Sequence, residues 1–297
     1  MKKLFVLVSI AFLSQSFCIA QEFFTSISVA KRLALVQDKM LFVVWEESLE
    51  YPYPLLYNDS KGNLIIIDLS QDKSFDAIIW EHFVPVLLSE TEYDRLLKAS
   101  KGRKASYIVK LNDDSIKIMD ANENILNTKL NYDIEQNLSE LIKTYSLRTT
   151  FLKQDLINYS QQANFTTSYN LGDKYIDFAL FVEENAREEV IELSNLYLEE
   201  SKKHLPTSDL QEKDAYLQRV DLLNIKQDLV LDRARRALRF LKKLDKADIA
   251  EVNKPLFNFL NYTTFMLLNN EDDAASWQSE LSEVDLKKAQ LILNINK

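Results

Sequence analysis

The segment Met40-Leu41-Phe42-Val43-Val44-Trp45 decides the class of fold. Its six consecutive apolar residues include two adjacent valines, a pattern typical of a strand buried on both faces. Before it, apolar residues recur with helical spacing until the polar run 37–39 ends the pattern: Ile27, Ala30, Leu33 and Ala34. A helix followed by a doubly buried strand indicates an α/β domain.

Two more apolar runs predict strands of the same domain. Residues 63–69 follow the turn signal 58–62, and we interpret them as a second buried strand. Residues 83–88 contain Pro85, which cannot donate a ladder hydrogen bond, so we expect this strand to lie at an edge. The remaining predicted elements of this half are a helix over 92–100, a hairpin of 107–111 with 115–119, and a helix over 133–145.

From about Leu152 the strand patterns end and helical stripes of apolar residues take over. They predict long helices of roughly 25 to 35 residues that pack antiparallel through short turns. The segment from Ser160 to Gly172 is the most loop-like part. The three stripes run from Phe178 to Tyr197, from Tyr216 to Leu244 and from Trp277 to Ile295.

The first twenty residues have the pattern of a signal peptide. Lys2 and Lys3 precede the apolar run 4–13, and Cys18-Ile19-Ala20 offers a cleavage site, so we expect the mature chain to begin at Gln21. Because Cys18 is the only cysteine, that chain contains no thiol. Acylation of Cys18 is the alternative, but it needs a small preceding residue and Phe17 is large.

The predicted protein is therefore exported, to the periplasm or the extracellular space. Its predicted organisation is a signal peptide at 1–20, an α/β domain at 22–148 and an all-α helical bundle at 149–297. No later apolar run is long enough for a transmembrane segment after signal cleavage.

Composition excludes several classes of function. The formal charge of −9 argues against a nucleic-acid partner. Three isolated glycines, Gly62, Gly102 and Gly172, cannot build a glycine-rich phosphate loop. The only imidazoles are His82, which we interpret as packed or capping at a strand entry, and His204, which we place at a helix end. We therefore assign no catalytic, metal-binding or cofactor-binding residues, and no cofactor.

The order of predicted elements over residues 24–147 resembles a thioredoxin-like domain, and Phe83-Val84-Pro85-Val86 is similar to a central strand of exported members. In that family a Cys-x-Pro-Cys motif follows the strand that matches 41–45 and opens a helix. Here Glu50-Tyr51-Pro52-Tyr53 stands in its place, followed by a shortened helix before Gly62. Since neither a carboxylate nor a phenol can attack a disulfide as a thiolate does, the resemblance implies a redox-inactive thioredoxin-like domain.

Two acidic motifs have simple structural interpretations. Asp120-Ala121-Asn122-Glu123-Asn124 begins like a calcium loop, but Ile125 and Asn131 stand where an EF-hand needs Gly and Glu. We therefore predict a hairpin turn. Glu46-Glu47 is either a general acid and base or a solvated strand end, and the absence of a partner motif favours the strand end.

Two other stretches are candidate binding surfaces. The first is the loop of Glu50, Tyr51, Pro52, Tyr53 and Tyr57, which either binds a peptide or glycan or fills the space left by the shortened helix. The second is the basic face of a helix predicted over 232–246. Its residues are Arg235, Arg236, Arg239, Lys242, Lys243 and Lys246. That face either is solvated and paired with nearby acids or meets an acidic partner or an anionic membrane.

These observations predict an exported, non-catalytic binding or adaptor protein whose partner is an unidentified or acidic protein. The alternative is a carboxylate-based hydrolase, for example one acting on glycans, whose two acids are far apart in sequence.

Overall fold

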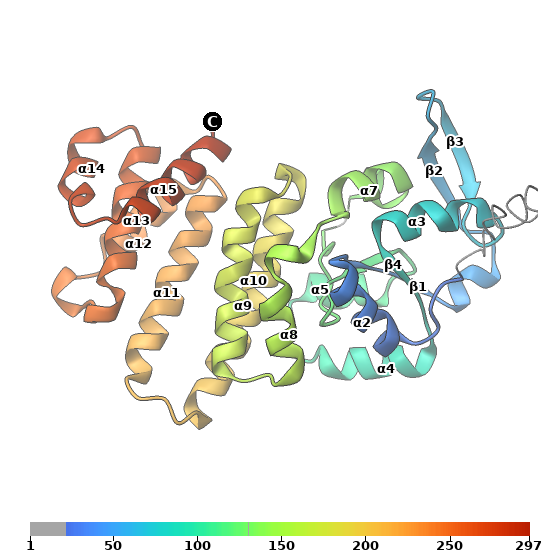
Figure 1. Cartoon of the computed structure of the whole chain (residues 1–297), viewed down its shortest axis with the longest axis horizontal. Coiled ribbons are helices and arrows are strands. Elements are labelled where there is room, and N and C mark those ends of the chain that lie inside the picture. Colours follow the sequence, from blue (N-terminus) through green and yellow to red (C-terminus); the bar gives the residue numbers. More distant parts are fainter. Residues whose placement is uncertain (1–21, 130) are drawn as a thin grey trace, which may run out of the picture.

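The structure is a computed structural model that describes residues 22–129 and 131–297. The molecule is elongated (Figure 1). A small α/β part lies at one end, helices α8 to α10 lie in the middle, and the last helices lie at the other end. The predicted signal peptide, including Cys18, lies outside the described residues. Within those residues, no helix combines the length and apolar character needed to span a membrane.

The first half contains short helices around two small sheets. Its elements are α2 (Ile27–Gln37), β1 (Leu41–Trp45), η1 (Glu47–Glu50), β2 (Pro54–Asn58), β3 (Leu64–Asp68), η2 (Lys73–Phe75), α3 (Asp76–His82), β4 (Val84–Leu88), α4 (Glu90–Ala99), α5 (Ala105–Asn112), β5 (Lys117–Met119), α6 (Tyr132–Glu135) and α7 (Leu138–Tyr145).

The larger sheet has the order β4-β1-β5, with β4 parallel and β5 antiparallel to the central strand. This confirms the two strands predicted at 40–45 and 83–88. A proline is tolerated at position 85 because the backbone nitrogen and carbonyl of this residue face away from β1. On that side, the Pro85 carbonyl accepts the Phe24 N–H at 3.0 Å. Alternate residues of β1 enter different cores. Leu41 and Val43 pack with α2, whereas Phe42 and Val44 join a large cluster that continues into the second half.

Two predictions for the first half are wrong in detail. Residues 107–111 form part of helix α5 rather than a strand. Tyr107, Lys110 and Leu111 are the buried residues, at a spacing of three and four that belongs to a helix. The helix predicted over 133–145 is interrupted, because the Asn137 side chain accepts the N–H groups of Ser139 and Glu140 and thereby starts α7.

The helix expected between Pro52 and Gly62 does not form, and the residues build a hairpin instead. Strand β3 coincides with the run predicted at 63–69, but it pairs only with β2 and is not buried on both faces. The turn explains the outcome. Gly62 has φ of +81°, and the Asp59 carboxylate accepts the N–H groups of Lys61 and Asn63 at 2.8 Å each.

The second half is helical, as predicted, in shorter pieces than expected. Its longest helix, α10, has 21 residues. The elements are η3 (Thr149–Phe151), α8 (Lys153–Gln161), α9 (Phe165–Phe178), η4 (Ala179–Phe181), α10 (Glu184–His204), η5 (Leu205–Thr207), α11 (Lys213–Val230), α12 (Ala234–Leu241), η6 (Lys246–Asp248), η7 (Glu251–Asn253), α13 (Lys254–Leu267), α14 (Glu271–Gln278) and α15 (Glu283–Ile295).

The loop predicted from Ser160 to Gly172 is largely helix α9. A capping box between Asn164 and Thr167 starts this helix. Gly172 is the place where α9 approaches α10 closely, and its carbonyl accepts the Ser194 hydroxyl at 2.7 Å. Gly172, at the end of the segment predicted as a loop, therefore serves helix packing.

Each predicted apolar stripe is interrupted. Turn η4 separates α9 from α10, and residues 279–282 separate α14 from α15. The second stripe breaks at Asp232, which has φ of 56°. The basic segment is consequently not one helix over 232–246, because α12 ends at Leu241 and Lys246 lies in η6.

Candidate functional site

The tyrosine-rich loop is only partly available to a partner. Tyr53 donates its hydroxyl to the Asp114 carbonyl at 3.0 Å, and burial raises the pKa of this tyrosine. Tyr57 packs edge-on against Phe75, with ring centroids 5.0 Å apart. Glu50, Tyr51 and Pro52 are exposed. Tyr53 and Tyr57 therefore fill space within the protein, as one of the two interpretations of this loop predicts, whereas the ring of Tyr51 is exposed.

The six basic residues predicted to share one face divide into three sets. Arg236 and Lys243 both lie over the ring of Phe240, at 5.7 and 5.6 Å from its centroid. Lys246 lies over Trp277 at 5.1 Å. The third set is exposed and makes no ion pair with any described residue: Arg235, Arg239 and Lys242.

Beside Phe240 the surface is hollowed into a groove of about 840 Å³, which we call the α12 groove. Helices α10, α11 and α12 bound it. Phe240 is 40% exposed at its lip, and Leu244 lies next to it. The apolar lining is Ile191, Leu222, Ile225, Leu231, Phe240 and Leu244, and the charged lining is Lys104, Glu192, Asp221, Asp228, Arg233, Arg236 and Lys243.

Most charges of the α12 groove are already paired. Arg236 lies 3.2 Å from the Asp228 carboxylate, whose pKa is raised by burial against the opposing effect of that arginine. Lys104 pairs with Glu192. Lys243, which follows the end of α12, has no ion pair among the described residues, so the groove presents one unpaired cation beside an exposed aromatic ring.

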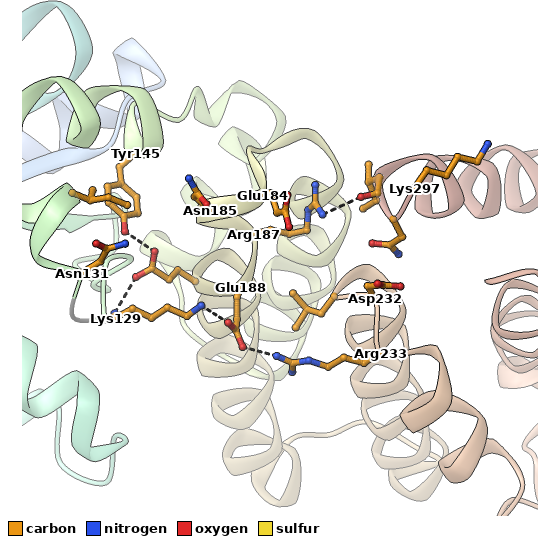
Figure 2. Close-up of a pocket in the computed structure, with 15 residues that line it drawn as sticks. Lys129, Asn131, Tyr145, Glu184, Asn185, Arg187, Glu188, Asp232, Arg233 and Lys297 are labelled. Carbon is orange, nitrogen blue, oxygen red and sulfur yellow. Dashed lines mark hydrogen bonds and ion pairs between the residues drawn. The ribbon is translucent and has the colours of Figure 1, made fainter. Parts of the chain in front are cut away.

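A second cleft of about 640 Å³ lies where the α/β part, α10 and the last residues of the chain meet. It shares Leu231 and Arg233 with the α12 groove. Figure 2 shows Lys129 and Arg233 reaching Glu188 from opposite sides. The hydrogen bond from Lys129 lowers the pKa of Glu188, so this carboxylate is an ionised link between the α/β part and the α11–α12 corner.

Glu189, the next residue of α10, is held differently. It is 1% exposed and accepts two hydrogen bonds, from the Tyr145 hydroxyl at 2.7 Å and from the Lys129 N–H at 3.0 Å. Burial raises the pKa of Glu189 to about 7. Because it is buried and each oxygen accepts a hydrogen bond within the protein, Glu189 joins α7 and α10 and does not face a substrate.

The turn predicted at 120–124 exists and has a second role that the sequence did not reveal. Asp120 accepts the N–H groups of Asn122 and Asn124 at 2.9 and 3.0 Å. Its other oxygen accepts the hydroxyls of Tyr175 and Tyr197 at 3.0 and 2.5 Å. Burial raises the pKa of Asp120. This carboxylate therefore anchors α9 and α10 to the α/β part.

The other residues considered from sequence are peripheral. Glu46 and Glu47 are exposed just after β1, as a solvated strand end requires. His82 ends α3 at the entry to β4, and His204 ends α10, 3.5 Å from Glu200. No group of three or more His, Cys, Asp or Glu residues in 22–129 and 131–297 is arranged to hold a metal ion.

Comparison of the chain with protein-family models, with curated proteins and with solved structures found no match.

Proposed function

We propose that this is an exported, non-catalytic binding or adaptor protein, and that its α12 groove takes a partner segment carrying acidic and apolar side chains. One observation carries the proposal. Arg236 and Lys243 both lie near the exposed ring of Phe240, which lines a groove that also contains apolar side chains of α10 and α11. A carboxylate of the partner would meet Lys243, and an apolar side chain would cover Phe240 and enter the groove.

The two kinds of contact have different roles. Burying one Leu-sized side chain contributes about 1.5 to 3 kcal/mol. An exposed ion pair contributes only about 0.2 to 1 kcal/mol. The apolar floor therefore supplies most of the affinity, whereas Lys243 and its neighbours select the sign of charge and make binding sensitive to salt.

Two of the four acidic residues that line the cleft of Figure 2, Glu188 and Glu189, are engaged within the protein, which weighs against their use in carboxylate-based hydrolysis, whereas Glu184 and Asp232 are exposed. A hydrolase of that kind needs two carboxyl groups that face the substrate. Here Glu188 is held between Lys129 and Arg233, and both oxygens of the buried Glu189 accept hydrogen bonds within the protein.

The first half serves, in this proposal, as a redox-inactive thioredoxin-like platform. Support comes from the parallel β1–β4 pair joined by the antiparallel strand β5. Glu50 and Tyr53, which stand where the family keeps cysteines, follow the end of β1. They provide no thiolate, and the proposed role of this half is to support α9 and α10 through Asp120 and Glu189.

The test uses two fluorescently labelled peptides of equal length, one rich in Leu and Glu and one rich in Leu and Lys. Fluorescence anisotropy should show binding of the Glu peptide, weakened by salt, and no binding of the Lys peptide. Lys243→Glu should weaken binding of the Glu peptide by about tenfold or more, because it places a like charge beside the ligand.

Lys242→Glu is the matched control. It makes the same charge change at the neighbouring residue, which is exposed, makes no ion pair with a described residue and does not line the α12 groove. Binding should survive this change. Equal loss of binding in the two variants, or no binding of the Glu peptide to the unmodified protein, would contradict the proposed site.

A further inference from the structure

Strand β3 has an open edge. Strands β2 and β3 form a ribbon that stands out from the α/β part (Figure 1). The hydrogen bonds at its two ends fix the orientation of the backbone between them. The Asp59 N–H donates to the Asn63 carbonyl at 2.9 Å, and the Leu69 N–H donates to the Tyr53 carbonyl at 2.9 Å.

The backbone polar groups of an antiparallel pair alternate between facing the partner and facing away. In the register of this ribbon, Ile65 lies opposite Tyr57 and Ile67 lies opposite Leu55. Both are an even number of residues from Asn63 and Leu69, whose backbone groups bond to β2 or its flanks, so the backbone groups of Ile65 and Ile67 also face β2. It follows that the N–H and carbonyl groups of Leu64 and Ile66 point away from β2, toward the free edge.

The two edges of the ribbon differ in their hydrogen bonding to the rest of the chain. On the β2 side, the Leu56 N–H donates to the Gln136 carbonyl at 2.7 Å, and the Asn58 N–H donates to the Ser139 hydroxyl at 2.9 Å. On the β3 side, the Asp68 carbonyl at the end of the strand accepts the Gln71 and Asp72 N–H groups, whereas no residue in the described ranges pairs with the outward groups of Leu64 and Ile66. An open edge of this kind is a template for another strand.

The exposed side chains of β3 are apolar, so covering them with a partner is favourable. Leu64, Ile65 and Ile66 are 58%, 39% and 76% exposed. Edges that avoid pairing carry charged residues, proline or a bulge, and 64–67 has none of these. Three consecutive exposed aliphatic residues with high strand propensity are therefore left without cover.

We propose that β3 pairs antiparallel with β3 of a second copy of this chain, about a twofold axis at Ile65, to form a continuous four-stranded sheet. The charges at the two ends of the ribbon support antiparallel pairing with a second copy. Antiparallel pairing brings the ribbon tip, with Lys61, beside the ribbon base, with Asp68, at both ends of the interface. Parallel pairing would place Lys61 beside its own equivalent.

The register follows from which residues carry outward backbone groups. An axis at Ile65 places Leu64 opposite Ile66 twice, so the four exposed aliphatic side chains cover one another. An axis at Ile66 would place Leu64 opposite Asp68, and an axis at Leu64 would place Ile66 opposite Gly62. Only the first register places an apolar residue opposite each of the three exposed residues 64–66.

Light scattering coupled to size exclusion, over a range of protein concentrations, measures the outcome. The purified protein should reach twice the mass of one chain, and Ile66→Lys should raise the dissociation constant by about tenfold or more, because it places like charges on both sides of the edge. Val36→Lys adds the same charge at an exposed residue of α2 and should leave the dimer intact. A protein that is monomeric at every concentration, or an Ile66→Lys variant that still dimerises normally, would overturn the proposal.

A second variant tests the register independently of folding effects. Across a non-hydrogen-bonded antiparallel pair the two Cα atoms lie about 4.5 Å apart, which a disulfide can span. In a Cys18→Ser background, Ile65→Cys should form a disulfide-linked dimer under mild oxidation, whereas Val36→Cys should not. A dimeric protein without this crosslink would overturn the β3 pairing.

Discussion

At the residue scale, buried carboxylates join parts of the chain that sequence does not connect. Glu189 binds Tyr145, 44 residues away, and Asp120 binds Tyr197, 77 residues away. The sequence identified the turn at Asp120 because Asx turns are local. It did not reveal the tyrosine partners, since such pairing depends on how α9 and α10 pack against the α/β part.

Glu189 makes stability depend on pH in a defined direction. The pKa of Glu189 is raised from its ordinary value of 4.5 to about 7 in the folded protein. Between these values the unfolded chain loses the proton first, so the folded state binds more protons and its stability falls as pH rises. The contribution is fully present below about pH 4.5 and lost above about pH 7, and amounts to at most about 3 kcal/mol.

Glu189→Gln should remove this part of the pH dependence. A glutamine can still accept the Lys129 N–H while donating to the Tyr145 oxygen, so it imitates the protonated carboxyl. Denaturant unfolding from pH 5 to pH 8 should give a flatter profile for the variant than for the unmodified protein. Glu184→Gln, at an exposed position of α10, is the control. Identical slopes for Glu189→Gln and the unmodified protein would refute this role.

At the element scale, continuous apolar runs were sufficient to predict β1 and β4, because strands buried on both faces have few alternatives. The same rule misled us at β3, where Leu64 to Ile66 have the composition of a buried strand and lie exposed. It also missed α5, since the short segment 107–111, apolar except for Lys110, fits either a strand or a helix. Local pattern cannot show which neighbour covers a run.

The α9–α10 pair provides a second prediction. A Cβ on Gly172 would lie 2.8 Å from the Leu198 side chain and 3.2 Å from its backbone nitrogen. Glycine to alanine within a helix normally gains about 1 kcal/mol, but overpacking costs about 1 to 3 kcal/mol. Because the backbone atom cannot move aside cheaply, the overpacking cost should exceed the propensity gain, and Gly172→Ala should lower the free energy of unfolding by up to about 2 kcal/mol.

Asn170→Ala is the matched control, on the exposed face of the same helix. Chemical denaturation should find it neutral or slightly stabilising, since alanine has the higher helix propensity. A Gly172→Ala variant as stable as Asn170→Ala would mean that the two helices do not rely on close approach at this glycine.

At the scale of the whole molecule, the sequence predicted a mixed first half and a helical second half, with a boundary near residue 148. One hydrophobic cluster crosses that boundary, from Phe42 in β1 to Ile292 in α15. The α12 groove also depends on three helices and on Lys104 from the first half. Its cations were visible in the sequence, whereas its apolar floor became apparent only once α10 and α11 were placed beside α12.

Hydrogen exchange with and without the Leu–Glu peptide tests the central claim most directly, because it compares both candidate surfaces in one protein. Binding at the α12 groove should slow exchange in residues 222–244 and leave the loop from Glu50 to Tyr57 unchanged. Protection of 50–57 with no change in 222–244 would contradict the account and assign the binding surface to the tyrosine-rich loop.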